Sequence, residues 1–264
     1  MNIQDLPWNL DEPRPQLPNI TVLGLNNFDA LVSELKEKNV SVIFSALPDS
    51  IANEVEQPLA ERGFCVISHA LIHRLKRDVP LVIPDINSDH LKILESQSFG
   101  TGSLISCSNC MVVPIALTLY PLMVEYDFSS VNIVTEQSLS GGGRKMLERG
   151  RSGLTIDSSI PGESESIISE LNRILGIKNE GIFQEANLDV KVWCSRSSHD
   201  FGHLATVEII FSNNISAHEI IEAWQNFSSD TFDSRLPSSS KIINFIDGKL
   251  DPIKHRWGDS IANL

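Results

Sequence analysis

The first half of the chain alternates between two spacings of its apolar residues. Strand-like runs are separated by segments whose apolar positions recur at helical spacing. We expect strands over 20–25, 40–47, 64–68 and 80–84, and helices over 28–38, 48–63 and 88–97. Strands that alternate with helices are typical of a parallel α/β sheet.

The second half has a different pattern. We expect helices over 111–124, 162–176 and 216–227, and strands over 128–138, 188–196, 203–212 and 241–246. The strands 188–196 and 203–212 are expected to pair as a hairpin, with its turn at 200–202. This order is typical of an α+β unit, so we expect a domain change near residue 109. Residues 1–19 contain four prolines and are expected to form an irregular arm.

Charge limits the classes of partner. The 264 residues carry a net charge of −13, which repels nucleic acid and anionic membranes. An anionic substrate must therefore be held by a few specific Arg or Lys residues. The longest apolar run, 111–124, contains Pro114 and Pro121 and is too short to span a bilayer. Four cysteines and the lack of an apolar leader predict a cytoplasmic protein.

The segment SCSNC (106–110) stands directly before the predicted helix 111–124. A cysteine at a helix N-terminus has a lowered pKa, because the helix dipole stabilises the thiolate, and such a thiolate is a nucleophile. Cys107 and Cys110 also fit a thioredoxin-like pair, although the residues that flank such a pair are lacking. They could also be half of a zinc site, but the sequence has no second ligand pair. A buried, inert cysteine is the plain alternative.

Three other segments carry candidate chemistry. The glycine run in TEQSLSGGGRK (135–145) is either an anion-binding backbone nest or a flexible hairpin. Arg196 and His203 suit a carboxylate-binding fork and an acid–base group, or are simply a solvated Arg and a structural His. The spacing of His199 and His203 needs a helix to bind a metal, and the flanking strands argue against one, so no metal site is predicted. Glu170 and Arg173 are either a surface ion pair or part of a binding site.

Taken in order, these segments resemble the aspartate-semialdehyde dehydrogenase family, most closely its archaeal and fungal-like branch. The resemblance lies in VIFSALPDSIA (42–52), RDVPLVIPDINSDHL (77–91), SNC (108–110), EQSLSGGG (136–143), IPGESE…SELNRIL (160–175) and CSRSSHDFGH (194–203). It implies a remnant of a Rossmann-type parallel sheet over 1–109, followed by an α+β catalytic and dimerisation domain over 110–264.

The resemblance also implies roles for individual residues. Cys110 would be the nucleophile that forms a thioester with an activated β-aspartyl group, and His203 the general acid–base. Arg196 would hold the substrate α-carboxylate and Glu170 the amino group. Gln137 and Asn109 would position the substrate beside the thiol, and Arg173 stands where the family has a phosphate-binding Lys.

The sequence departs from the family at both ends. No glycine-rich dinucleotide turn occurs before Val22, and the chain stops at Leu264, before the expected last strand and helix of the family. Ser45, Gly141 and Gly142 would be the remnants of a cofactor site. On this reasoning we expect no bound cofactor, and NADP only under the alternative below.

Three functions follow from this interpretation. The first is a Cys110-dependent acyltransferase that passes the acyl group to an unknown acceptor without NADPH. The alternative is NADPH-dependent reduction of aspartyl phosphate to aspartate semialdehyde, with another chain completing the pocket if needed, and the third is a non-catalytic scaffold. The expected partners are a small-molecule acyl donor, an aspartate kinase-like enzyme that supplies it, and a second copy of the chain in a homodimer.

Overall fold

The fold begins with a four-stranded parallel sheet that is covered by helices. A computed structural model describes residues 1–264 except 180–181, 230–240 and 256–259. The sheet has the order β1-β2-β4-β3, and all its neighbouring strands are parallel. Its strands are β1 (Val42–Ser45), β2 (Cys65–Ser68), β3 (Leu81–Val82) and β4 (Ser103–Cys107). The prediction of a parallel α/β unit is confirmed.

The helices predicted over 28–38 and 48–63 are present, whereas the predicted helix 88–97 is a 3-10 segment and the short helix 84–87 was not predicted. Asn27 starts the first by accepting a hydrogen bond from the backbone N–H of Ala30 at 3.0 Å, a side-chain cap that satisfies one free donor of the first turn. The helices are α1 (Phe28–Glu37), α2 (Asp49–Glu61) and α3 (Pro84–Asn87), with 3-10 segments at η1 (Ile3–Asp5), η2 (Leu71–His73) and η3 (Ser88–Ser96).

One prediction about this half is wrong, and one strand was missed. Residues 20–25 form no strand: Thr21 makes only an isolated bridge with Asn2, and Ile20 and Leu25 stay exposed. β4 was not predicted, because SLISC alternates serine with apolar residues in a short run. It nevertheless lies between two strands, and its Leu104 is fully buried.

The second half is built on the sheet β8-β5-β9, in which β5 (Phe128–Gln137) is central. β8 (Asp189–Arg196) is parallel to β5 and β9 (Leu204–Phe211) is antiparallel to it. The predicted hairpin of 188–196 with 203–212 is therefore wrong, since β5 lies between these strands. The short connection between β8 and β9 does not require them to pair directly, because β5 lies between them in the sheet.

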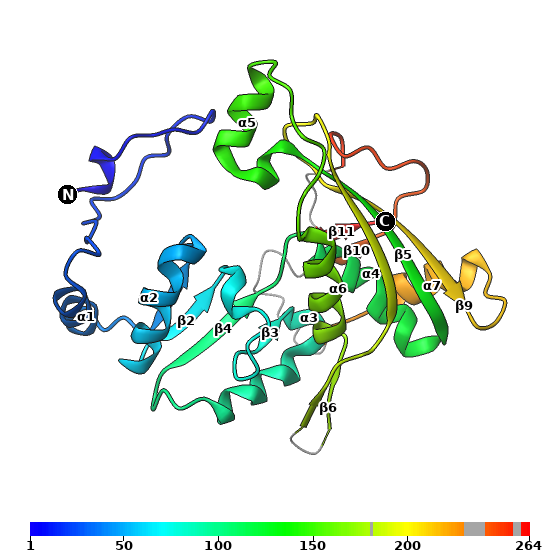
Figure 1. The fold of residues 1–264 in the computed structure, drawn as a ribbon, viewed down its shortest axis with the longest axis horizontal. Coiled ribbons are helices and arrows are strands. Elements are labelled where there is room, and N and C mark those ends of the chain that lie inside the picture. The colour runs from blue at the N-terminus through cyan, green and yellow to red at the C-terminus, as the bar shows by residue number, and fades with distance from the viewer. Residues whose placement is uncertain (180–181, 230–240, 256–259) are drawn as a thin grey trace.

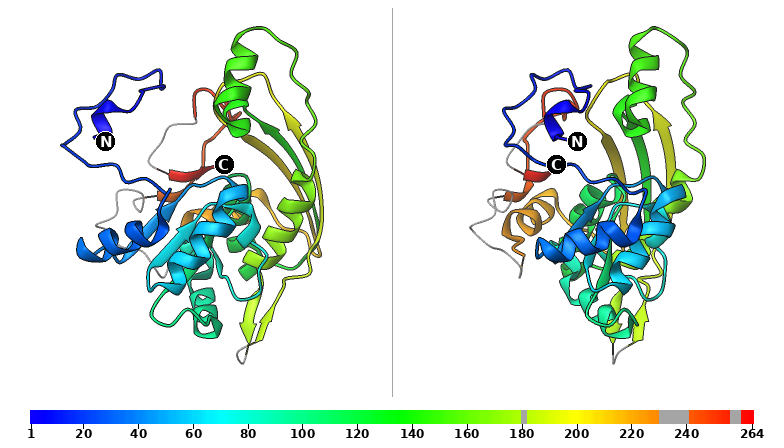
Figure 2. Two further views of the ribbon diagram at one scale, coloured as in Figure 1. Left: turned by 60° about the vertical axis from the view of Figure 1, so that its left-hand side comes forward. Right: turned by 90° about the vertical axis from the view of Figure 1, so that its left-hand side faces the viewer.

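Helices cover one face of this sheet. Figures 1 and 2 show α4 (Val112–Glu125) and α6 (Glu163–Ile174) on the side that faces the parallel sheet, while the other side faces away from the molecule. Ile115, Ile133 and Leu171 are buried in this common core. The remaining elements are η4 (Leu139–Gly142), α5 (Gly143–Arg151), β6 (Ile177–Asn179), β7 (Ile182–Gln184), α7 (Ala217–Asn226), β10 (Lys241–Asn244) and β11 (Ser260–Asn263).

The apolar core falls into two clusters. One joins residues between positions 32 and 104, including Val32, Phe64 and Leu104. The other joins the second half but also takes in Leu81 and Ile83 from β3 and its end. The exact boundary at 109/110 stays a prediction. Within the described part of the chain, no helix combines the length and apolarity needed to cross a bilayer.

Candidate functional site

A cavity of about 700 Å³ opens at the carboxyl edge of the parallel sheet. Ligands of open α/β sheets bind at this edge, because the strand ends present loops and helix N-termini there. The lining comes from the ends of β2, β3 and β4, from the end of β5 and the glycine run, from α6, and from β8. These residues are His69, Arg74, Val82, Ile83, Pro84, Asp85, Cys107, Ser108, Asn109, Cys110, Val113, Gln137, Gly141, Ile160, Glu163 and Arg196.

Four of the predicted catalytic and substrate-binding residues meet in this lining, together with Gly141. Cys110 opens onto the cavity from the turn between β4 and α4. Asn109, Gln137 and Arg196 line the same space, although they come from three different elements. The Arg196 guanidinium donates from Nη1 to the carbonyl of Ser138 at 3.0 Å, which fixes its direction. The fold brings these four residues together in one cavity, and their catalytic roles stay predictions.

The thiol does not have the lowered pKa that its place before a helix suggests. The cavity walls desolvate the Cys110 thiol, and the nearby Glu163 carboxylate adds to this, so its pKa is raised. Hydrogen bonds from the backbone N–H groups of Cys110 and Met111, and the charge of Arg74, act in the opposite direction and are outweighed. The surroundings of Cys110 in this structure therefore favour the thiol over the thiolate.

Glu170 lies beneath the cavity and does not line it. Its side chain is fully buried, and four groups donate to it. Oε2 accepts from Ser108 Oγ at 2.9 Å and from the Asn109 backbone N–H at 2.7 Å, and Oε1 accepts from Arg74 Nη1 at 3.0 Å and from Ser166 Oγ at 2.9 Å. Glu170 thus holds the turn that carries Cys110, whereas its predicted contact with substrate stays untested.

Arg173 also points away from the cavity. Its Nη2 donates to the carbonyls of Lys76 at 2.6 Å and Val79 at 3.0 Å, and the guanidinium lies 5.4 Å from the centre of the Phe183 ring. Burial lowers its pKa. In this arrangement the Arg173 side chain holds the loop before β3 against α6. The arginines that line the cavity are Arg74 and Arg196.

Glu163 was missed by the sequence analysis. It is the first residue of α6, and its Oε1 accepts from Asn109 Nδ2 at 3.0 Å and from Gln137 Nε2 at 2.9 Å. Its place seven residues before Glu170, on the same helical face, is the signal that could have found it. Arg74 was missed too, because nothing in its own segment distinguishes it from a surface arginine.

His203 lies beside the cavity, behind the glycine run. A Cβ on Gly141 would lie 3.0 Å from Arg196 Nη1 and 3.1 Å from His203 Cε1, so only glycine lets both side chains approach this backbone. The His203 Nδ1 accepts from the Ser138 backbone N–H at 3.1 Å, which leaves the proton of the neutral ring on Nε2. Burial and the charge of Arg196 lower the pKa of His203.

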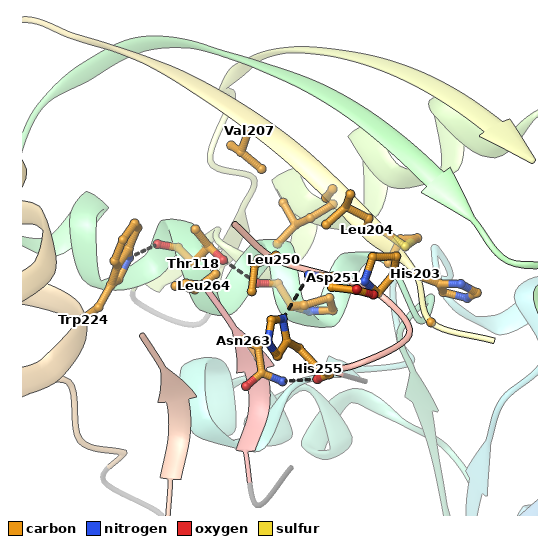
Figure 3. A pocket seen from close by; sticks show the side chains of 17 residues that line it. Thr118, His203, Leu204, Val207, Trp224, Leu250, Asp251, His255, Asn263 and Leu264 are labelled. Atoms are coloured by element: carbon orange, nitrogen blue, oxygen red, sulfur yellow. Dashed lines mark hydrogen bonds between the residues drawn. The ribbon is translucent and has the colours of Figure 1, made fainter. Parts of the chain in front are cut away.

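A second cavity of about 400 Å³ has His203 in its lining, together with side chains that are mostly apolar. In Figure 3 the labelled side chains run from Trp224 at one end to His203 at the other. Among the described residues, Gly141 and not His203 lines the larger cavity, and His203 lies directly behind that glycine. No hydrogen bond joins it to Cys110 among the residues that the structure describes.

The glycines expected as cofactor remnants have separate positions. Gly141 lines the larger cavity, whereas a Cβ on Gly142 would meet the side chain of Met146 at 2.8 Å, so Gly142 packs against α5. Ser45 ends β1 with a buried hydroxyl that has no hydrogen-bond partner among the described residues. A space over Gly141 and an unpaired hydroxyl at the sheet edge both suit a nicotinamide nucleotide.

The comparisons with known proteins agree with this geometry. Residues 17–94 match the model of the semialdehyde dehydrogenase NAD binding domain. The chain is 34% identical over 198 residues to an aspartate-semialdehyde dehydrogenase of Archaeoglobus fulgidus. This alignment covers 72% of the present chain and 56% of the relative. It is 28% identical over 234 residues to a malonyl CoA reductase (NADP) of Metallosphaera sedula, over 83% of this chain and 64% of the relative.

The fold has solved counterparts. The aspartate semialdehyde dehydrogenase of Candida albicans, solved with NADP, aligns with a TM-score of 0.70 at 24% identity, over 82% of this chain and 64% of that one. The chain thus spans a little over half of the length of the curated relatives that it matches.

These findings correct the expectation that no cofactor binds. The matched domain is a nicotinamide-nucleotide domain, and it covers the part of the chain that was expected to have lost this function. The lack of a glycine motif therefore did not predict the outcome correctly, because residues 17–94 match the NAD binding domain without it. The relatives carry the names of oxidoreductases, which gives no support to a cofactor-free acyltransferase. By sequence and by fold, the chain is a member of the aspartate-semialdehyde dehydrogenase family.

Proposed function

We propose that the chain is an NADP-dependent reductase that converts aspartyl phosphate to aspartate semialdehyde through a thioester on Cys110. The observation that carries the proposal is the single cavity that brings together Cys110, Asn109, Gln137 and Arg196 at the carboxyl edge of the parallel sheet. The names and cofactors of the relatives support the same reaction class.

Each residue has a defined task in this proposal. Arg196 binds the substrate α-carboxylate as a planar fork, with its orientation held by the Ser138 carbonyl. Asn109 and Gln137, both tied to Glu163, position the acyl group beside the thiol. His203 presents an Nε2–H that can give its proton to a leaving or forming oxygen.

The nicotinamide nucleotide would lie along the sheet edge. Ser45 and Gly141 would contact it from the end of β1 and from the glycine run. When bound, NADPH supplies the hydride that reduces the thioester carbon. This chain's own residues provide the nucleophile, the proton donor and the carboxylate fork.

We also propose a homodimer that uses the open face of the sheet β8-β5-β9. Val134, Trp193 and Ile210 are exposed on this face, and Val134 is directly opposite Trp193 in the strand register. Exposed apolar side chains on one face of a sheet are typical of an interface. Analytical ultracentrifugation of wild type and Trp193→Glu tests this, and a monomeric wild type would contradict it.

The reaction is tested in the reverse direction by absorbance at the nicotinamide band. Purified protein is mixed with aspartate semialdehyde, phosphate and NADP⁺, and the Cys110→Ala variant is the control. We expect phosphate-dependent NADPH formation that Cys110→Ala abolishes. Formation that survives in Cys110→Ala, or none with wild type, would overturn the proposal.

A further inference from the structure

The second cavity, of about 400 Å³, is separate from the site that holds Cys110. Among the residues that the structure describes, the two cavities have no lining residue in common. The volume of the second cavity falls within the range of about 300–1,000 Å³ that small-molecule sites occupy. The proposed reaction uses His203 from its lining and leaves the space itself without a role. The cavity is therefore a candidate for a second binding site.

The walls of this cavity favour an apolar occupant. Ile115 of α4, Val207 of β9 and Leu250 line it, together with Trp224 of α7. The indole Nε1–H of Trp224 donates to the Thr118 carbonyl at 3.0 Å, so the polar group of this ring is already satisfied and the rest of the ring is apolar. An apolar molecule that enters such a space removes apolar surface from water on both sides, which is favourable.

Two polar residues restrict the charge of the occupant. Asp251 accepts from the backbone N–H groups of Ile253 at 2.8 Å and Lys254 at 3.2 Å, which lowers the pKa of Asp251 and keeps it a carboxylate that repels an anion. His255 accepts at Nδ1 from the Asp251 backbone N–H at 2.9 Å, so the neutral ring carries its proton on Nε2. Within the described part of the chain no group accepts that proton, and the oxygen of an uncharged ligand suits it.

The cavity ends at His203. Figure 3 shows Trp224 and His203 at opposite ends of the lining. The imidazole of His203 accepts at Nδ1 from the Ser138 backbone N–H at 3.1 Å, and it lies directly behind Gly141, which lines the larger cavity. A molecule that fills the second cavity therefore contacts the residue that stands behind the wall of the first.

The backbone next to His203 belongs to the same wall. Gly202 has a φ of +87°, a conformation that favours glycine, and a Cβ at this position would overlap the Pro252 carbonyl. The segment 250–255 thus packs directly against Gly202. An occupant that displaces this segment also displaces the residue before His203.

We infer that the second cavity is a regulatory site for an uncharged, apolar small molecule with a hydrogen-bond acceptor, and that its occupancy restrains His203. Binding is independent of the proposed function, whereas the effect on turnover rests on it. With His203 restrained, proton transfer is impaired while Arg196 and the larger cavity stay open to substrate. An occupied site should therefore lower kcat and leave the KM for aspartate semialdehyde nearly unchanged.

The first test measures binding by fluorine NMR and needs no turnover. The probe is 4-fluoroacetophenone, an uncharged ring with a ketone oxygen, and 4-fluorobenzoate is its anionic counterpart of similar shape. We expect saturable binding of the ketone to wild type, and binding of the benzoate that is weaker by roughly tenfold or more, because burial against apolar walls disfavours a charge.

Variants locate the bound probe. Val207→Phe enlarges the wall on β9 and Leu250→Phe enlarges the wall on the 250–255 segment, so each should abolish binding by filling the space. Val124→Phe is the matched control, because it adds the same ring at a 68% exposed position near the end of α4. Circular dichroism shows whether each variant is folded, and the two filling variants enter from different elements.

The second test measures the coupling to His203. The imidazole Cε1–H resonance of His203, assigned by its loss in His203→Gln, should shift when 4-fluoroacetophenone binds to wild type or Val124→Phe, and should not respond in Val207→Phe. In steady-state assays the saturating ketone should lower kcat by roughly fivefold or more, the lower end of typical coupling between two sites. The KM for aspartate semialdehyde should stay within about twofold.

Each result decides a separate question. No saturable binding to wild type, or unchanged binding in both filling variants, overturns the inference. Equal affinity for the benzoate overturns the assignment to an uncharged ligand, and binding that leaves the His203 resonance in place overturns the coupling. If binding and the shift occur as expected but no NADPH forms, the site stands and the proposed reaction is wrong.

Discussion

Arg74 and Glu170 form a buried ion pair across the two halves of the chain, with Nη1 and Oε1 3.0 Å apart. Arg74 follows η2 at the end of the parallel sheet, and Glu170 lies within α6 of the second half. The same carboxylate accepts the backbone N–H of Asn109 at 2.7 Å. The pair therefore couples the docking of α6 to the conformation of the turn that carries Cys110.

Glu170→Gln should lower both stability and activity. An amide cannot accept all four hydrogen bonds, and Arg74 would lose its buried counter-charge, which costs roughly 3–5 kcal/mol. Urea unfolding measures the first effect and NADPH formation the second. The double variant Arg74→Met/Glu170→Met should recover part of the stability but none of the activity. A single variant as stable as wild type would contradict the role given to this pair.

Gly141→Ala should impair catalysis with little change in stability. The added Cβ would lie 3.0 Å from Arg196 Nη1 and 3.1 Å from His203 Cε1, so both side chains must move by a few tenths of an ångström or more. Misplacement of a positioning group by about 1 Å costs up to about 10²-fold in rate. Steady-state kinetics of wild type and Gly141→Ala measures the loss of activity, and their melting temperatures show whether stability is unchanged. Wild-type kcat/KM in the variant would show that this close approach is not needed.

Gly102→Ala should destabilise the parallel sheet. Its Cβ would overlap the Ala60 carbonyl, which belongs to the backbone of α2 and cannot rotate away. Overpacking of this kind costs roughly 1–3 kcal/mol, and more when the backbone must shift. Gly24→Ala is the control, because its Cβ would have nothing within 4 Å. Equal denaturation midpoints for the two variants would argue against the close contact of α2 with β4.

The buried His73 should make stability depend on pH. Burial, followed by the charge of Lys76, lowers its pKa below the ordinary 6.5. The unfolded chain then binds a proton that the folded chain does not, in the range between the lowered pKa and 6.5. Stability should therefore fall as the pH drops below about 6.5, and level off once the pH is below the lowered value.

The measurement for His73 is the urea midpoint of wild type and His73→Gln between pH 5 and 7.5. The difference between the two proteins isolates this residue from His203, whose pKa is also lowered. Parallel curves for both proteins would contradict the prediction. Both proteins keep Glu56, whose Oε2 lies 2.8 Å from His73 Nε2, so the comparison changes only the histidine.

The local pattern of the sequence was enough for most elements. The helical spacing over 28–38 and 162–176 predicts α1 and α6 to within two residues, because burial of one face imposes a 3.6-residue period. The sequence also predicted the family and the position of Cys110 at the edge of the sheet. The run 20–25 has the composition of a strand but forms none, since a strand also needs a neighbour to pair with.

What the tertiary structure alone decided is the pairing of distant segments. β5 lies between β8 and β9, although a direct hairpin satisfies the same alternation. On α6, Glu163 and Glu170 share a face, but two helical turns separate them by about 10 Å along the axis. This distance places the first carboxylate in the cavity and the second beneath it. The sequence determined that the helix carries both acids. Only the docking of α6 against β8, β3 and α4 decided which of them lines the cavity, because docking depends on contacts between residues far apart in the chain.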